Sequence, residues 1–188
     1  MTTDQPASAY FIDENREIEH RTTLAVLVSN EPGVLARVVG LFSGRGYNIE
    51  SLTVSETEHE AHLSRITIVT RGTDKVLAQI KAQLMRLVPV HKVVDMTGAA
   101  LAAGFEKAIE RELALVKVAG KGQDRLESLR LAESFEAKVV DATTGHFVFE
   151  ITGRSQKIEQ FITIMQPLGL VEVARTGVAA LNRGAEGL

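Results

Sequence analysis

The spacing of hydrophobic positions changes repeatedly along the chain, and each change predicts a new element. Thr23–Val28 is a short run rich in β-branched and aliphatic side chains, which is typical of a strand. From Val34 to Phe42 the hydrophobic residues recur at helical spacing, which predicts a helix. Gly44–Gly46 ends this helix, because glycine readily adopts the left-handed conformation found at helix ends.

The pattern then alternates with period two over Tyr47–Val54 and again over Leu63–Val69, which predicts an antiparallel hairpin. Thr73 and Asp74 open a second helix whose apolar face runs to Leu87. Pro89 ends that helix, and residues 90–96 form a last strand. The predicted order is therefore β-α-β-β-α-β.

The same order recurs more weakly in the second half of the chain. The predicted elements are a strand at Leu113–Val118, a helix at Arg125–Phe135, a hairpin of Lys138–Asp141 and Phe147–Ile151, a helix that Ser155 caps, and a strand at Val171–Ala174. Gly169 ends the second helix of this unit. The repeat predicts an α+β protein of two ferredoxin-like βαββαβ domains, each with both helices on one face of an antiparallel sheet.

An Ala- and Gly-rich stretch separates the two units. The predicted division is a flexible acidic tail (1–20), a first domain (21–97), a linker (98–109), a second domain (110–184) and a short tail (185–188). Two helices cover only one face of each sheet, and the edge strands have unpaired backbone groups. We therefore expect a homodimer, the alternative being a monomer whose two units pack on each other.

Composition excludes several classes of protein. The 188 residues include no Cys and no Trp, which excludes a disulfide scaffold, a Cys-based zinc site and a thiol nucleophile. The formal net charge of -3, with Lys and Arg scattered, argues against nucleic-acid binding. No apolar run approaches the roughly 20 residues of a membrane span, and the acidic first 20 residues do not resemble a signal peptide. We expect a cytoplasmic protein.

The stretch Asn30–Leu35 is the strongest candidate for a binding site. It leads from the first strand into the first turn of the first helix, where Pro32 needs no intrahelical hydrogen bond. The N–H groups of Gly33, Val34 and Leu35 then point outward at the positive end of the helix dipole, which favours an anion such as a carboxylate. Asn30 offers both a donor and an acceptor. The alternative is an ordinary helix start that water satisfies.

The stretch Gly46–Glu50 is the second candidate. Asn48 interrupts an otherwise β-forming run, in which Asn is depleted. It either faces a ligand or is a polar residue on the exposed side of the strand.

Catalytic and metal-binding motifs were sought and none was found. The five histidines show no metal-ligand spacing, no Gly-x-Ser-x-Gly elbow occurs, and no Gly-x-x-x-x-Gly-Lys phosphate loop occurs. No metal site and no catalytic residue are predicted.

Together these motifs resemble an ACT domain and, more narrowly, the regulatory small subunits of acetolactate synthase. The stretches that carry the resemblance are Asn30–Arg37, Leu41–Val54, Leu63–Arg65, Arg111–Val118 and Val171–Gly177. The resemblance covers about residues 21 to 184. Pro32 departs from the pattern, because relatives often have a small residue there, and it removes one backbone donor.

The resemblance implies a chain without an active site or cofactor of its own. Members of this family bind a large catalytic subunit that uses thiamine diphosphate, Mg and FAD, raise its activity, and confer feedback inhibition by valine or another branched-chain amino acid. The family's effector site lies between two ACT domains, which implies a homodimer through these domains. Carried onto this chain, the effector (valine) site comprises Asn30, Gly33, Val34 and Leu35 of one protomer with Asn48 and Ile49 of the other.

Three alternatives remain open at this point. Acylphosphatases share the fold but use an Arg-bearing phosphate loop that is missing after the first strand. RNA-binding modules of this topology read bases with aromatic side chains on central strands, and the strands Leu24–Val28 and Leu63–Val69 contain none. An ACT-domain sensor that regulates another amino-acid biosynthetic enzyme is the closest competitor.

Overall fold

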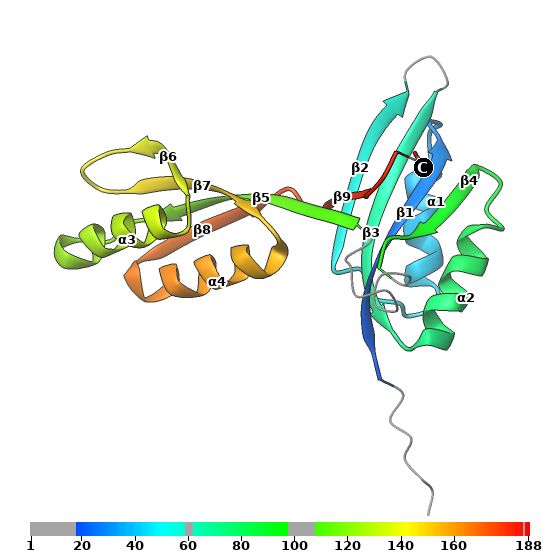
Figure 1. Ribbon diagram of the computed structural model, residues 1–188, viewed down its shortest axis with the longest axis horizontal. Coiled ribbons are helices and arrows are strands. Elements are labelled where there is room, and N and C mark those ends of the chain that lie inside the picture. The colour runs from blue at the N-terminus through cyan, green and yellow to red at the C-terminus, as the bar shows by residue number, and fades with distance from the viewer. Residues whose placement is uncertain (1–17, 59–61, 98–107, 186) are drawn as a thin grey trace, which may run out of the picture.

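The chain folds into two lobes joined by a narrow β-ribbon (Figure 1). The structure is a computed structural model that describes residues 18–58, 62–97, 108–185 and 187–188. Most of the predicted linker and N-terminal tail lie outside the described residues, so the domain division stays a prediction. Among the described residues, no helix is both long enough and apolar enough to span a membrane.

The first lobe is a four-stranded antiparallel sheet with two helices on one face (Figure 1). Its elements are β1 (His20–Ser29), α1 (Val34–Ser43), β2 (Ser51–Glu58), β3 (Leu63–Gly72), α2 (Asp74–Leu84) and β4 (Val90–Asp95). The strand order is β2-β3-β1-β4, so the central strands are the two that carry the longest apolar runs. This is the predicted ferredoxin-like order, which is confirmed.

Alternation along β1 and β3 decides which side chains reach the core of this lobe. Leu24, Val26 and Ile66 point toward the helices and are fully buried there. Helix α1 contributes Val38 and Phe42 to the same core, two of its residues at helical spacing. The core therefore fixes the face of α1 and, with it, the direction in which the start of α1 points.

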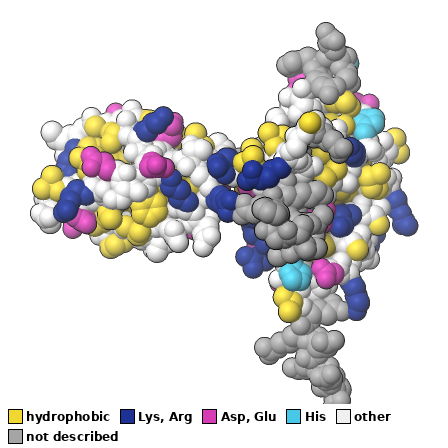
Figure 2. Space-filling model, viewed as in Figure 1, with side chains coloured by type: hydrophobic (Ala, Val, Ile, Leu, Met, Phe, Trp, Pro, Cys, Tyr) yellow, Lys and Arg dark blue, Asp and Glu magenta, His cyan; other side chains and the backbone are white. Residues whose placement is uncertain are grey.

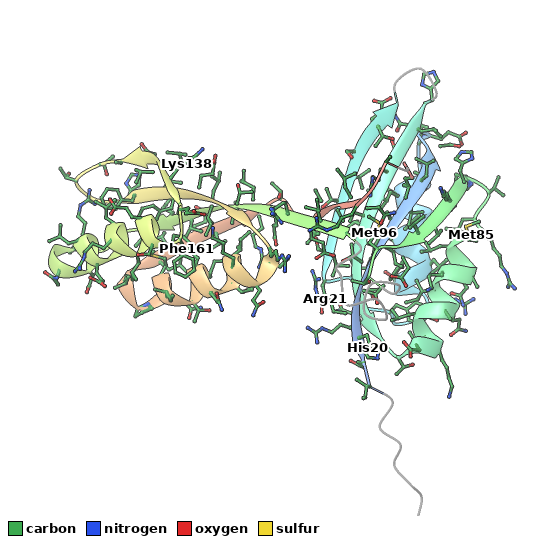
Figure 3. The ribbon with its side chains drawn as sticks, viewed as in Figure 1. His20, Arg21, Met85, Met96, Lys138 and Phe161 are labelled. Atoms are coloured by element: carbon green, nitrogen blue, oxygen red, sulfur yellow. The ribbon has the colours of Figure 1, made fainter. Side chains whose placement is uncertain are left out.

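The second lobe repeats the arrangement. Its elements are β5 (Ala108–Val118), α3 (Gly122–Ser134), β6 (Lys138–Ala142), β7 (Phe147–Gly153), α4 (Ser155–Met165), a 3₁₀ turn η1 (Gln166–Leu168) and β8 (Leu170–Arg175). The strand order is β6-β7-β5-β8. Phe161 lies between α4 and the sheet (Figure 3), with its ring 5.4 Å from that of Phe135 and 6.0 Å from that of Phe149. Such ring clusters dominate the energetics of small cores.

A ribbon of β5 and β9 (Ala179–Asn182) joins the lobes. The first four residues of β5 pair with β9, whereas the rest of β5 lies at the centre of the second sheet. Val178 and Ala180 are buried against Ala25, Val69 and Met96, on the face of the first sheet that the helices leave uncovered. The last strand of the chain thus packs on the first lobe.

Two local predictions were wrong, and one strand was not predicted. The hairpin strand predicted at residues 47–54 begins only at Ser51, because the carbonyl of Asn48 accepts a hydrogen bond from the Thr70 hydroxyl, at 2.6 Å, before the ladder forms. Ser155 does not cap α4: it is the first helical residue, Arg154 precedes it as the cap without a side-chain bond, and the Ser155 hydroxyl bonds to Glu112. The sequence pattern did not predict β9.

Candidate functional site

Helix α1 starts at an uncapped N-terminus. Gly33 is its N-cap, with φ 86° and ψ -4°, a left-handed conformation that glycine adopts without steric cost. No side chain bonds to the first amides of α1, and its first turn holds no acidic residue. Within the first turn of α1, therefore, no carboxylate offsets the positive end of the helix dipole.

The backbone donors at this end are mostly unpaired. The amide of Val34 donates to the carbonyl of Glu31 over a long 3.4 Å, so one of the three predicted donors is partly occupied. Among the described residues, the amides of Gly33 and Leu35 have no hydrogen-bond partner. A β-carbon built on Gly33 would meet nothing within 4 Å, so a ligand can reach this backbone.

The side chains around this end serve different purposes. Asn30 is exposed. Its backbone N–H donates to the backbone carbonyl of His62 at 2.7 Å, and this bond fixes the loop after β1. Leu35 is 41% exposed and offers an apolar surface beside the amides. Val34 is only 4% exposed and packs in the core, so of this residue only the backbone faces the site.

Asn48 and Ile49 lie in the loop before β2. Asn48 is exposed, and Ile49 is half-buried against the edge of the core. Next to them, the Glu50 carboxylate contacts two guanidinium groups, Arg71 at 2.5 Å and Arg21 at 3.3 Å, and the Glu50 amide donates to Val69. The loop is therefore held firmly while the Asn48 side chain stays accessible.

One chain does not bring the two groups of residues together. Asn30 lies beside His62, just before Leu63 at the start of β3, whereas Asn48 lies beside Thr70 at the end of β3. Seven residues of strand separate Leu63 from Thr70, a distance of about 23 Å at about 3.3 Å per residue. A site that uses both Asn30 and Asn48 needs two protomers.

The histidines form no metal centre in the described part of the chain, where no group of three or more potential ligand side chains converges. His146 bonds through Nδ1 with the Thr143 hydroxyl at 2.9 Å and through Nε2 with Asp141 at 2.8 Å. The Thr143 hydroxyl also accepts from the amides of Gly145 and His146. These contacts close the β6–β7 turn.

Comparisons with known proteins match each lobe to a described family. Residues 24–92 match the family described as the AHAS small subunit-like ACT domain. Residues 111–184 match the family described as the small subunit of acetolactate synthase. The first lobe is therefore an ACT domain.

Relatives align over nearly the whole chain. A probable acetolactate synthase small subunit of Archaeoglobus fulgidus is 46% identical over 86% of this chain and 96% of its own. The isozyme 3 small subunit of Escherichia coli is 44% identical over 87% and 96%. The crystal structure of the Thermotoga maritima acetolactate synthase small subunit superposes with a TM-score of 0.77, at 38% identity, over 89% of this chain and 99% of that chain. The chain belongs to the family of acetolactate synthase small subunits.

Arg21 has contacts that no local sequence pattern indicates. Its guanidinium bonds to Glu50 beside the candidate site and, at 3.3 Å, to Glu110 of β5. An Arg at the start of a strand carries no local signal of such a role, because both partners are distant in sequence.

Proposed function

We propose that this chain is the regulatory subunit of acetolactate synthase. It activates a catalytic large subunit dependent on thiamine diphosphate, which carries the Mg and FAD as well, and it confers feedback inhibition by valine. Membership of the small-subunit family supports the partner, and the open amides at the start of α1 support the effector site.

The chemistry of these residues suits an α-amino acid. The carboxylate accepts hydrogen bonds from the amides of Gly33 and Leu35 at the positive end of α1. The side-chain oxygens of Asn30 and of the partner's Asn48 hold the ammonium group. Leu35 of one protomer and the partner's Ile49 contact the aliphatic side chain.

The position of β2 at the edge of its sheet supports a site that two protomers build together. This strand pairs with β3 on one side, and no described strand pairs with its other side. If β2 pairs antiparallel with its copy, the beginning of one β2 lies beside the end of the other. Asn48 precedes that beginning, and Asn30 lies at the opposite end of the sheet, so the pairing brings the two asparagines of different protomers together.

Valine inhibits in this mechanism because it binds across the interface. A ligand shifts an equilibrium only by its difference in affinity between the two states. Valine therefore stabilises the dimer geometry in which both halves of the site close, and that geometry is the less activating one. Selection of valine over leucine or isoleucine by one methylene contributes only about 1–3 kcal/mol.

Isothermal titration calorimetry of valine into Gly33→Asp and Gly33→Asn tests the site. Both side chains tolerate a left-handed backbone and enter open space, so both variants fold. The Asp carboxylate repels the carboxylate of valine, and we expect at least a tenfold greater loss of affinity for Asp than for Asn. Unchanged valine binding in Gly33→Asp would exclude the site.

Co-purification with the catalytic subunit tests the partner. The wild-type chain should retain a thiamine-diphosphate enzyme on an affinity column and raise its rate of acetolactate formation. Retention of a different amino-acid biosynthetic enzyme would instead support the alternative ACT sensor.

A further inference from the structure

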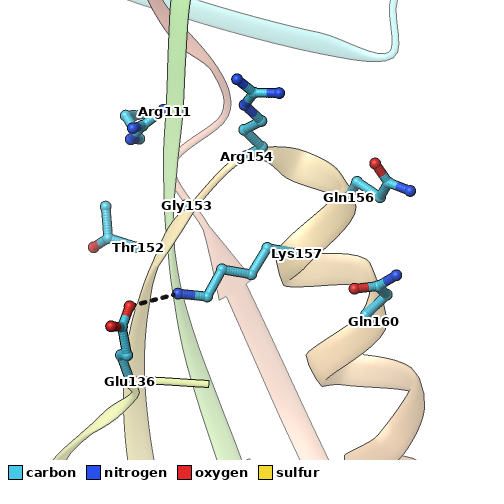
Figure 4. A pocket seen from close by; sticks show the side chains of 8 residues that line it. All are labelled: Arg111, Glu136, Thr152, Gly153, Arg154, Gln156, Lys157 and Gln160. Carbon is cyan, nitrogen blue, oxygen red and sulfur yellow. Dashed lines mark hydrogen bonds and ion pairs between the residues drawn. The ribbon is translucent and has the colours of Figure 1, made fainter. Parts of the chain in front are cut away.

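A polar hollow opens in the second lobe where β7 ends and α4 begins (Figure 4). Its volume is about 500 Å³, and its lining includes Arg111, Glu136, Thr152, Arg154, Gln156 and Lys157. The hollow exists because β6 starts only opposite Glu150, which leaves the last residues of β7 without a neighbour on that side. Gly153, with no side chain, deepens the floor, and the Lys157 stem lies across it.

Positive charge dominates this hollow. Arg111, Arg154 and Lys157 line it, with Glu136 as the one carboxylate among its lining residues. The Lys157 Nζ lies 3.3 Å from the Glu136 carboxylate, which is 87% exposed and therefore a weak competitor for the cation. Lys and Arg side chains also gather on the surface where the two lobes meet (Figure 2).

The backbone adds to this positive character. Helix α4 has 11 residues, begins at the rim of the hollow, and has neither a side-chain cap nor an acidic residue in its first turn. The one hydroxyl at its start, that of Ser155, bonds to Glu112 instead. The Glu112 carboxylate therefore also lies at the start of α4 and offsets part of the helix dipole, so the three cations supply most of the positive charge of the hollow.

We propose that this hollow binds a small phosphate-bearing anion. The Arg111 guanidinium, whose Nη1 donates to the Glu110 carbonyl at 2.8 Å, retains further N–H donors for phosphoryl oxygens, and Arg154 and Lys157 add positive charge. Thr152 and Gln156 supply neutral donors. No aromatic side chain lines the hollow, so the phosphoryl group rather than a stacked ring is recognised. The proposal concerns the second lobe and does not depend on the effector site.

Inorganic pyrophosphate is the probe, titrated into the full chain by calorimetry and followed by the amide shifts of Thr152 and Gln156. Arg111→Gln should weaken binding about tenfold or more, because it removes charge-assisted hydrogen bonds. Arg130→Gln is the matched control: this exposed Arg of α3 pairs with Glu127 within its own helix and lies outside the hollow. The control should bind as the wild type does.

Glu136→Gln is the decisive variant because it removes the one lining carboxylate, which repels an anion, and should therefore tighten pyrophosphate binding several-fold. A variant that merely damaged the fold would weaken binding. Failure of Glu136→Gln to tighten binding, an equal loss in Arg130→Gln, or the absence of saturation at millimolar pyrophosphate would each overturn the proposal. Valine titration of the same samples keeps this result separate from that of the effector site.

Discussion

Arg21 of β1 and Glu110 of β5 lie 3.3 Å apart, Nη1 to Oε2, across the junction between the two lobes. Figure 3 shows Arg21 on the flank of the first lobe that faces the second. The same guanidinium contacts Glu50, which follows Asn48 and Ile49 directly in the chain. One side chain therefore connects the proposed effector loop with the strand that carries the second lobe.

A double-mutant cycle with Arg21→Gln and Glu110→Gln measures this connection. Both side chains are partly exposed, 31% and 21%, so we expect a coupling free energy of unfolding of about 0.5–1 kcal/mol. Arg130→Gln with Glu127→Gln provides a matched cycle within helix α3, where the atoms lie 3.5 Å apart. The expected coupling there is smaller. Equal coupling in the two cycles would show that the ion pair between the lobes is no stronger than an exposed ion pair within one helix.

Gly177 permits the ribbon to approach β2. Its φ is +82°, and an added β-carbon would lie 2.7 Å from Thr53 Oγ1 and 2.8 Å from Ser51 Oγ. We expect Gly177→Ala to lower the free energy of unfolding by about 2–3 kcal/mol, which combines backbone strain with overpacking. Thermal unfolding measures the loss, and hydrogen exchange at the Val178 amide, which donates to Ser51 Oγ at 3.0 Å, reports the detachment.

Gly184→Ala separates the two contributions to that loss. Gly184 has a similar φ of +98°, but its added β-carbon would enter open space. The variant should lose only the strain, about 1 kcal/mol. If both alanine variants are equally unstable, the close approach at Gly177 is not important for the ribbon.

Val54→Asp tests the proposed pairing of β2 with its copy. Val54 points to the helix side of the sheet edge and is 45% exposed in the single chain, so a second protomer would bury it. Sedimentation should show dimers of the wild type and monomers of the variant, because a buried unpaired carboxylate costs several kcal/mol. Val88→Asp, at a position 94% exposed before β4, should remain dimeric. A dimeric Val54→Asp chain would place the interface elsewhere.

Glu112 gives the second lobe a dependence on pH. Burial alone would raise the pKa of Glu112, but hydrogen bonds from Arg175 and Ser155 outweigh burial and hold it below the ordinary value. The stabilisation is therefore complete above about pH 4.3, the pKa of an unperturbed Glu, and is lost as the pH falls through the lowered value. Glu112→Gln should cost about 2 kcal/mol at neutral pH and flatten the acid limb of stability.

Acid unfolding of the second lobe, followed by the shifts of its Phe resonances, measures this effect. Lys117→Gln breaks the exposed pair with Glu172 and should leave the unfolding midpoint at neutral pH nearly unchanged. An acid limb as steep in Glu112→Gln as in the wild type would assign the pH dependence to other carboxylates.

Local patterns predicted the two ferredoxin-like lobes because alternating and helical spacings dictate which faces are buried. Leu24 and Val38 illustrate this: each lies in the core that its spacing indicates. The pattern failed where a distant group replaced a local one. The Thr70 hydroxyl bonds to the Asn48 carbonyl ahead of β2, and Glu112 engages the hydroxyl of Ser155, which is the first residue of α4 and not its cap. Both partners lie far away in sequence, so no window of the sequence contains the signal.

The effector residues could be named from the sequence only through a family resemblance. The motif at Asn30–Leu35 indicated an anion site. The position of Asn48 in the sequence did not distinguish a ligand contact from an ordinary exposed polar residue. Val34 shows the limit of the motif: its side chain belongs to the core, and only its amide faces the site. Strand β9 was missed because it is only four residues long and its buried residue, Ala180, packs on Ala25 and Val69, more than a hundred positions earlier in the chain.

Because β9 packs on the first lobe, that lobe is completed only when the end of the chain has been synthesised. Ala25 and Val69 leave the ribosome early, yet Val178 and Ala180, which cover them, are made more than a hundred residues later. At about 5–20 residues per second, the uncovered face of the first sheet stays open for roughly five to thirty seconds before Val178 and Ala180 are made. During that interval the nascent ACT domain presents an apolar face to chaperones, and the chain becomes a finished subunit only when its last strand arrives.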